Sequence, residues 1–187
     1  GRLPLGEAGA LHFRGLRAEV QTFLEQLRPH FGEGYIDPIP VDLTLGEFRL
    51  AGDMRRLTTK GSLHYRCASI KPKDLLRFWV QQLVLNAALP GGPYSNAVLV
   101  GSDKVFEAPP LPEAPALLAS LLDLYWKGLT TPLKFFPQTA WAYADAALKQ
   151  EGGRSKQEPI AVARVKWERH PFTGAPGECE DPYFDLC

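Results

Sequence analysis

One segment of this sequence, residues 71–89, constrains the possible folds more than any other. Its apolar side chains recur at helical spacing, and Pro72 and Asp74 suit the first turn of a helix. Residues 47–67 before it and residues 97–107 after it alternate apolar and polar side chains, as half-buried strands do. A helix between two such β-hairpin segments predicts an α/β or α+β fold, in which helices cover a mixed sheet.

Weaker patterns predict the other elements. The Lys60–Gly61 step supplies a hairpin turn, and two prolines limit residues 36–45 to an edge strand. Thr139 is a suitable N-terminal cap for one of the remaining helices. Those helices are expected over residues 16–31, 116–127, 139–149 and 155–169.

The length of 187 residues suits a single domain over 1–187. Residues 1–10 are expected to be a linker or the remnant of a tag, and residues 171–187 an irregular acidic tail. We therefore expect one module of a longer protein.

Composition excludes several classes of protein. The 21 basic and 21 acidic residues give zero net charge, which argues against a freely diffusing nucleic-acid binder. No apolar run approaches the ~18 residues that a membrane helix needs. Three irregularly spaced cysteines favour reduced thiols in the cytoplasm. A zinc site of His170, Cys179 and Cys187 would lack the paired ligands typical of such sites, so no metal is expected.

The zero net charge hides a basic segment at residues 49–77, where eight basic residues face only Asp53 and Asp74. Residues 1–48 and the tail are acidic. The basic segment could hold phosphates of DNA or pair with acidic protein surfaces, and the sequence favours neither. The candidate contact residues in it are Arg55, Arg56, Lys60, Arg66, Lys71 and Lys73.

Aromatic residues add a second set of candidates. Phe135 and Phe136 follow Lys134 in a proline-bounded loop, where they could form a surface wedge or a docking contact. Helical spacing and apolar neighbours instead predict core positions for three tryptophans, Trp79, Trp126 and Trp141.

The most specific signal is a missing motif. Metal-dependent nucleases of the restriction-endonuclease type hold Mg²⁺ with an acid on one strand and an acid two residues before a lysine on the next. No lysine in this chain has Asp or Glu two residues before it. The chain also lacks the GxGxxG, GxSxG and HExxH motifs.

Four stretches of the chain resemble one known family. They are LAGDMRRL at 50–57, GSLHYR at 61–66, KDLLRFWVQQLV at 73–84 and TPLKFFPQTAWAY at 131–143. They resemble the RecC C-terminal domain, and the resemblance covers residues 42–167.

This resemblance implies a restriction-endonuclease-like mixed sheet flanked by helices, similar to the RecB nuclease domain, with a degenerate active site. Arg55 then stands where a metal-binding acid is expected. His64 and Arg66 stand where an active relative would have Asp and Lys. Asp53 is the one acid left nearby.

The resemblance further implies a non-catalytic domain of the gamma subunit of exodeoxyribonuclease V, the RecBCD helicase–nuclease. Its implied partners are RecB, RecD and double-stranded or forked DNA in recombinational double-strand break repair. No cofactor, small-molecule substrate or membrane is implied. Two alternatives stay open: an active Mg²⁺-dependent nuclease that uses Asp53 with Asp42 and Glu47, and an unrelated protein-interaction module.

Overall fold

The computed structural model describes residues 4–92 and 94–184 and divides the chain into two compact units, Gly1–Ser120 and Leu121–Cys187. The sequence predicted a single domain over 1–187, whereas the structure has these two units. The division falls inside helix α3 (Ala114–Gly128), whose buried residues, Ala114 and Leu118, both lie in its first half. The second half of α3 therefore belongs with the segment that follows it.

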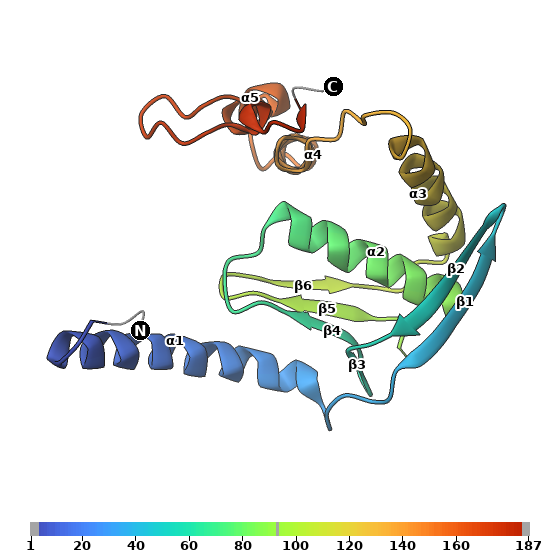
Figure 1. The fold of residues 1–187 in the computed structure, drawn as a ribbon, viewed down its shortest axis with the longest axis horizontal. Coiled ribbons are helices and arrows are strands. Elements are labelled where there is room, and N and C mark those ends of the chain that lie inside the picture. The colour runs from blue at the N-terminus through green and yellow to red at the C-terminus, as the bar shows by residue number, and fades with distance from the viewer. Residues whose placement is uncertain (1–3, 93, 185–187) are drawn as a thin grey trace. The chain divides into compact units, whose positions relative to one another are not determined.

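Unit 1 is built on a four-stranded mixed sheet of order β3-β4-β5-β6 (Figure 1). Strands β4 and β5 are parallel, with Leu63 opposite Val98, and the two outer pairs are antiparallel. The expected mixed sheet of an α+β fold is thus confirmed. The strands are β1 (Ile39–Leu45), β2 (Phe48–Met54), β3 (Leu57–Thr58), β4 (Gly61–Tyr65), β5 (Ala97–Val100) and β6 (Val105–Ala108). Strands β1 and β2 form a separate antiparallel hairpin.

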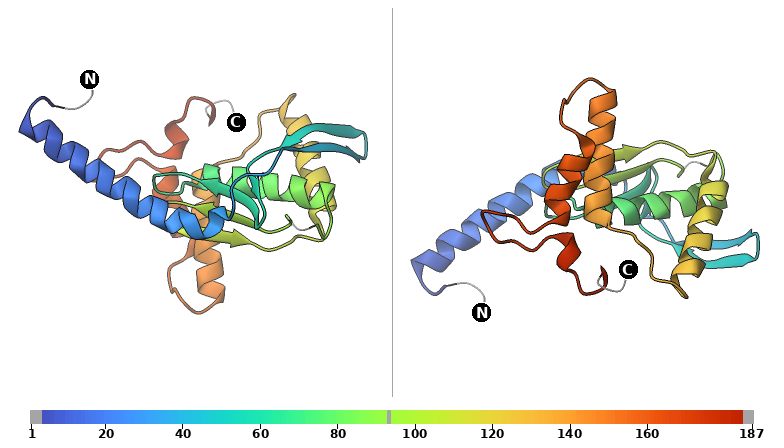
Figure 2. Two further views of the ribbon diagram at one scale, coloured as in Figure 1. Left: turned by 90° about the horizontal axis from the view of Figure 1, so that it is seen from below. Right: turned by 90° about the horizontal axis from the view of Figure 1, so that it is seen from above.

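Two helices cover opposite faces of this sheet, as Figures 1 and 2 show. Helix α1 (Glu7–Phe31) packs Phe23 and Leu27 on Leu63 and Val100, and helix α2 (Pro72–Ala88) packs Phe78 on Ala97 and Leu99. This division follows from strand geometry, because successive side chains of β4 and β5 point to opposite faces. Within β4, Leu63 consequently faces α1 while His64 faces α2.

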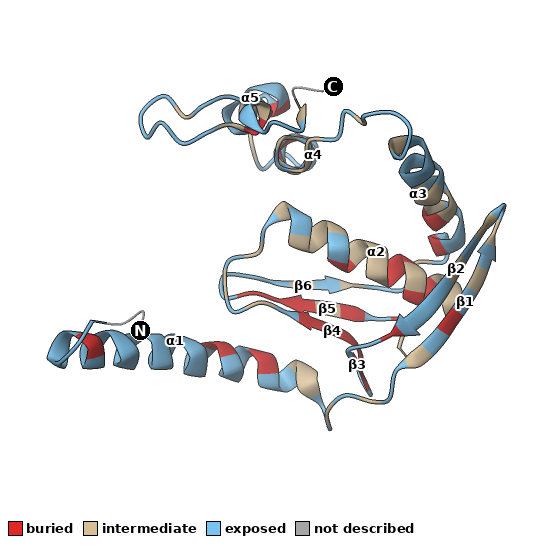
Figure 3. Cartoon of the chain, viewed as in Figure 1, coloured by how far each residue is buried: buried red, intermediate tan, exposed pale blue. Residues whose placement is uncertain are grey.

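Helix α1 is longer than the sequence predicted. It begins at Glu7, so residues 7–10 of the segment expected to be a linker or tag remnant are helical, and the helix expected over 16–31 starts nine residues earlier. Glu7 in the first turn favours this extension, because a negative charge there complements the helix dipole. At the other end, Lys60 Nζ donates to the Pro29 carbonyl oxygen at 2.6 Å. Most of α1 is exposed, as its pale blue colour in Figure 3 shows.

A buried amide network ties α2 to the proline-rich connection that follows the sheet. Asn86 Nδ2 donates to the carbonyl oxygens of Gln82 at 2.9 Å and Ser95 at 3.2 Å. Asn86 Oδ1 accepts from the Leu111 backbone N–H at 3.0 Å. One buried side chain therefore fixes both the loop before β5 and the loop before α3.

Unit 2 contains helices α4 (Pro137–Glu151) and α5 (Pro159–Trp167) and the short 3₁₀ helix η1 (Glu178–Glu180). The start of α4 is capped from a distant part of the chain: Glu178 accepts from the Gln138 and Thr139 N–H groups at 3.0 and 2.8 Å. The prediction that Thr139 caps this helix is wrong. Thr139 lies inside α4, and its buried hydroxyl has no hydrogen-bond partner among the described residues.

The tryptophan prediction is partly wrong. Trp79 on α2 is half-buried, but Trp126 and Trp141 are 62% and 43% exposed. Helical spacing alone does not show which stripe of a helix meets a neighbour. No helix in the described part of the chain is long and apolar enough to span a bilayer.

Candidate functional site

A hollow of about 320 Å³ lies where strand β2 ends, beside β4 and the exposed side of α2. Arg55 and Arg56 occupy the two-residue junction between β2 and β3. Helix α2 returns over the sheet after β4 and brings two more polar side chains to the same place. The residues that line the hollow are Asp53, Met54, Arg55, Arg56, His64, Arg77 and Gln81.

Three of the four positions expected from a degenerate nuclease site meet in this hollow: Asp53, Arg55 and His64. Arg66 does not line it. Its Nη1 donates to Asp74 Oδ2 at 2.8 Å, and the same carboxylate oxygen accepts from the Lys71 N–H at 3.0 Å. Arg66 therefore ties the end of β4 to the first turn of α2.

His64 is a buried, uncharged histidine. Burial, and next the positive charge of Arg56, lower the pKa of His64 from 6.5 to about 4. Its Nε2 lies 2.7 Å from the Ser62 hydroxyl oxygen, and its ring meets the ring of Phe78 edge-on at 5.6 Å between centroids. At neutral pH, His64 adds no charge to the hollow.

The charged groups at the hollow are mainly basic. Asp53 Oδ2 lies 3.9 Å from Arg55 Nη2, with both side chains more than half exposed, so this ion pair is loose and contributes little stability. Arg56 and Arg77 add two further guanidinium groups. Three arginines against one aspartate leave two net positive charges.

The remaining basic candidates lie outside the hollow. Lys60 contacts the end of α1, as described above. Lys71 and Lys73 are exposed at the start of α2. The geometry therefore separates Arg55 and Arg56, which share one hollow, from basic residues that hold elements together or extend into solvent.

The acids considered for an active nuclease do not gather around Asp53. Asp42 and Glu47 belong to the β1–β2 hairpin and its turn, and neither lines the hollow. Asp42 accepts from Arg49 Nε and Nη2 at 2.9 and 2.8 Å, which lowers the pKa of that carboxyl. Within residues 4–92 and 94–184, no three His, Cys, Asp or Glu side chains could together hold a metal ion. Cys187 lies outside the described residues.

Sequence reasoning missed Arg77 and Gln81 as parts of this site. They are spaced four residues apart on α2, which places both on one face of that helix. That spacing was a usable signal, because it predicts that two polar side chains lie together on one side of the helix. Which part of the sheet the pair faces could not be read from the sequence.

The two phenylalanines proposed as a wedge are separated by the fold. Phe135 is about half exposed. Phe136 packs its ring edge-on against Trp167 and Phe184, at 4.6 and 4.8 Å between centroids. Phe136 therefore belongs to the small apolar cluster of unit 2, and Phe135 alone is available for an outside contact.

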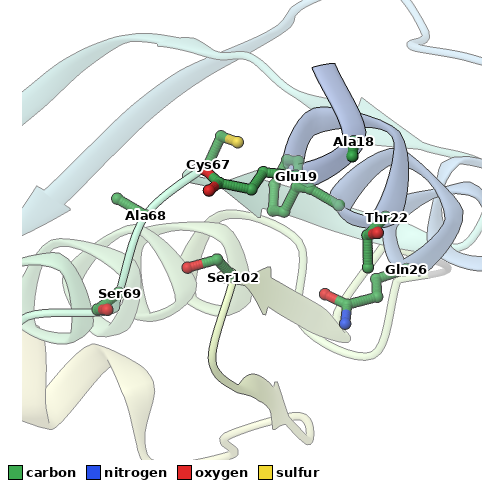
Figure 4. A pocket seen from close by; sticks show the side chains of 9 residues that line it. Ala18, Glu19, Thr22, Gln26, Cys67, Ala68, Ser69 and Ser102 are labelled. Carbon is green, nitrogen blue, oxygen red and sulfur yellow. The ribbon is translucent and has the colours of Figure 1, made fainter. Parts of the chain in front are cut away.

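A second, larger cavity of about 630 Å³ lies between α1 and the loops that follow β4 and β5. Figure 4 shows Glu19, Thr22 and Gln26 on one face of α1, opposite Cys67 and Ser102. None of the predicted site residues lines it. Cys67 is an exposed free cysteine there.

Comparison with known proteins points to one family. Residues 1–148 match the family model of the RecC C-terminal domain. The chain is 28% identical, over 97% of its length, to the RecBCD enzyme subunit RecC of Mycobacterium tuberculosis (strain CDC 1551 / Oshkosh), and 23% identical, over 76% of its length, to that of Escherichia coli (strain K12). It spans only 16% and 13% of the length of these relatives.

Proposed function

Because the chain belongs to the RecC C-terminal domain family, we propose that it is a non-catalytic domain of a RecC-type subunit and works inside a RecBCD-type helicase–nuclease in the cytoplasm. In this role it holds RecB- and RecD-type subunits together and guides DNA during double-strand break repair. The proposal includes a nuclease-like fold of the restriction-endonuclease type. A mixed sheet covered by α1 on one face and α2 on the other supports that part.

One observation carries the non-catalytic part of the proposal: the hollow holds three guanidinium groups. A catalytic Mg²⁺ is held by oxygen ligands, usually one or two carboxylates together with water and the phosphates of the substrate. Here Asp53 is the one carboxylate at the hollow, and Arg55 already lies beside it. Arg56 and Arg77 would also repel a cation, so the electrostatics suit an anion rather than a metal ion.

Exposed apolar side chains in unit 2 support contact with another subunit. Four large hydrophobic residues in the second half of α3 and just beyond it, all within residues 124–129, are each more than half exposed. They are Leu124, Tyr125, Trp126 and Leu129. Concentrated exposed apolar surface marks protein–protein contacts more often than DNA contacts. We call these four residues the α3 surface.

The experiment is retention of the partner subunits. The chain, carrying an affinity tag, is co-expressed with the RecB- and RecD-type subunits of its own organism, and the complex is isolated and separated by size. We expect stoichiometric retention of at least one subunit, because an interface centred on exposed aromatic residues is stable enough to isolate.

A paired variant tests the surface itself. Tyr125→Ser with Leu129→Ser removes apolar area without touching the described core, and we expect it to reduce retention strongly. The control is Val105→Ser, at an exposed apolar residue on strand β6 of unit 1. Failure of the unaltered chain to retain either subunit would refute the proposed role. Full retention by the paired variant would refute the α3 surface as the contact.

A further inference from the structure

The arginine-lined hollow does more than lack the ligands of a metal ion. It also has the properties of a binding site for another group. Its volume of about 320 Å³ is at the lower end of the range for small-molecule sites, so it suits one small charged group rather than a large ligand. Its rim carries Arg55, Arg56 and Arg77. Each guanidinium offers several N–H donors in a planar fork that matches the oxygens of a phosphate.

The backbone of Arg56 is held in an unusual conformation at this rim. Its φ of 61° makes it the one non-glycine residue with positive φ in the described part of the chain. This left-handed conformation is sterically unfavourable for any residue with a Cβ atom. The Arg56 carbonyl oxygen accepts from the Leu63 N–H at 2.9 Å, which keeps the residue in place against that cost. Strain of this kind concentrates at functional sites.

The side of the hollow against α2 is polar and incompletely satisfied. Gln81 lines it, and its Oε1 is buried without a hydrogen-bond partner among the described residues. A half-turn of this amide places its NH₂ group there instead, which gives two more donors for an oxyanion. His64 lies beside it and stays uncharged at neutral pH, so it takes no proton from a bound anion.

From these observations we infer that the hollow is an oxyanion site that holds one phosphate group between Arg55, Arg56 and Arg77. The inference rests on the proposed function for the source of that phosphate, which is the backbone of a DNA strand. Free phosphate has the same chemistry and is the other possible source. The loose pairing of Asp53 with Arg55 fits this inference, because an incoming phosphate can take the place of an exposed carboxylate at little cost.

The test measures binding of three probes to the complete chain. They are a labelled single-stranded oligonucleotide without terminal phosphates, the same oligonucleotide with a 5′-phosphate, and inorganic phosphate. The double variant Arg56→Gln, Arg77→Gln removes two guanidinium groups from the hollow. The matched control, Arg17→Gln with Arg28→Gln, removes two exposed arginines from α1.

We expect the hollow double variant to bind at least one probe about tenfold more weakly than the control does, because charge-assisted hydrogen bonds to phosphate are lost. For the oligonucleotides, its dependence on salt should also flatten by about one unit of slope per lost arginine. Asp53→Asn removes the competing carboxylate and should tighten binding of the same probe.

The probe that responds identifies the source of the phosphate. An equal effect on both oligonucleotides indicates the DNA backbone, an effect confined to the 5′-phosphorylated strand indicates a strand end, and an effect on inorganic phosphate alone indicates free phosphate. The inference is overturned if the unaltered chain binds none of the three, or if hollow and control variants bind alike. Retention of partner subunits by the hollow variant is measured in parallel, so that loss of this site is distinguished from failure of the proposed assembly role.

Discussion

The buried His64 makes the stability of unit 1 depend on pH, and replacing it should remove that dependence. Burial and Arg56 lower its folded pKa to about 4, against 6.5 in an unfolded chain. Between these values the unfolded state binds a proton that the folded state excludes. Stability is therefore complete above about pH 7 and falls as the pH drops towards 4.

The magnitude follows from the two pKa values. One pKa unit corresponds to about 1.4 kcal/mol, so the loss reaches about 1 kcal/mol by pH 5.5 and about 3 kcal/mol below pH 4. The first interval, from pH 7.5 to 5.5, is the informative one, because most carboxylates have not begun to titrate there.

Unfolding in urea is measured at pH 7.5 and at pH 5.5. It is monitored by hydrogen exchange in peptides from β4 and α2. Following peptides of unit 1 avoids assuming that both units unfold together. The variant is His64→Gln, which keeps a polar group near Ser62 but has no imidazole to titrate. The control is His12→Gln, at an exposed histidine on α1.

We expect unaltered protein and the His12 control to lose about 1 kcal/mol across this interval, and His64→Gln to lose much less. An equal loss in all three proteins would refute the reasoning. So would an NMR titration that places the pKa of His64 near 6.5, because it would show that burial and Arg56 do not disfavour the charged imidazole.

Two further substitutions test contacts between distant parts of the chain. Glu178→Gln weakens the cap of α4 and should destabilise unit 2 by about 1–2 kcal/mol in urea unfolding, whereas Thr139→Val should be neutral or slightly stabilising, because it removes a buried hydroxyl without a partner. Asn86→Ala leaves the Leu111 N–H without its partner and removes one of the two donors to the Ser95 carbonyl, the other being Gln82 Nε2, so we expect a loss of about 1–3 kcal/mol and faster hydrogen exchange in the loop before α3.

Local signals explain what the sequence predicted correctly. The helix over residues 71–89 is observed as Pro72–Ala88, and the hairpin expected over residues 97–107 as Ala97–Val100 and Val105–Ala108. Proline at a helix start, alternating strands and a glycine turn act within a few residues of one another, so their pattern is readable without the fold. The mixed sheet then follows, because a helix between two hairpins favours one parallel strand pair.

Contacts between distant residues explain what it missed. Glu178 caps α4 from 39 residues away, and no local pattern around Thr139 reports this. The sequence predicted part of the hollow, because the family resemblance assigned Asp53, Arg55 and His64 to one degenerate active site. Arg77 lines the hollow because α2 packs on the sheet, and Arg66 does not line it and instead pairs with Asp74.

We propose that the arginine-lined hollow stands where an active relative holds its catalytic metal ion. In the most direct measurement, the purified chain is incubated with linear double- and single-stranded DNA in Mg²⁺ and in Mn²⁺. The length of the DNA is then measured by gel electrophoresis. We expect both DNA substrates to stay intact in the presence of either metal ion. Metal-dependent degradation that Asp53→Ala abolishes would contradict it, since Asp53 would then be a working ligand despite the guanidinium groups around it.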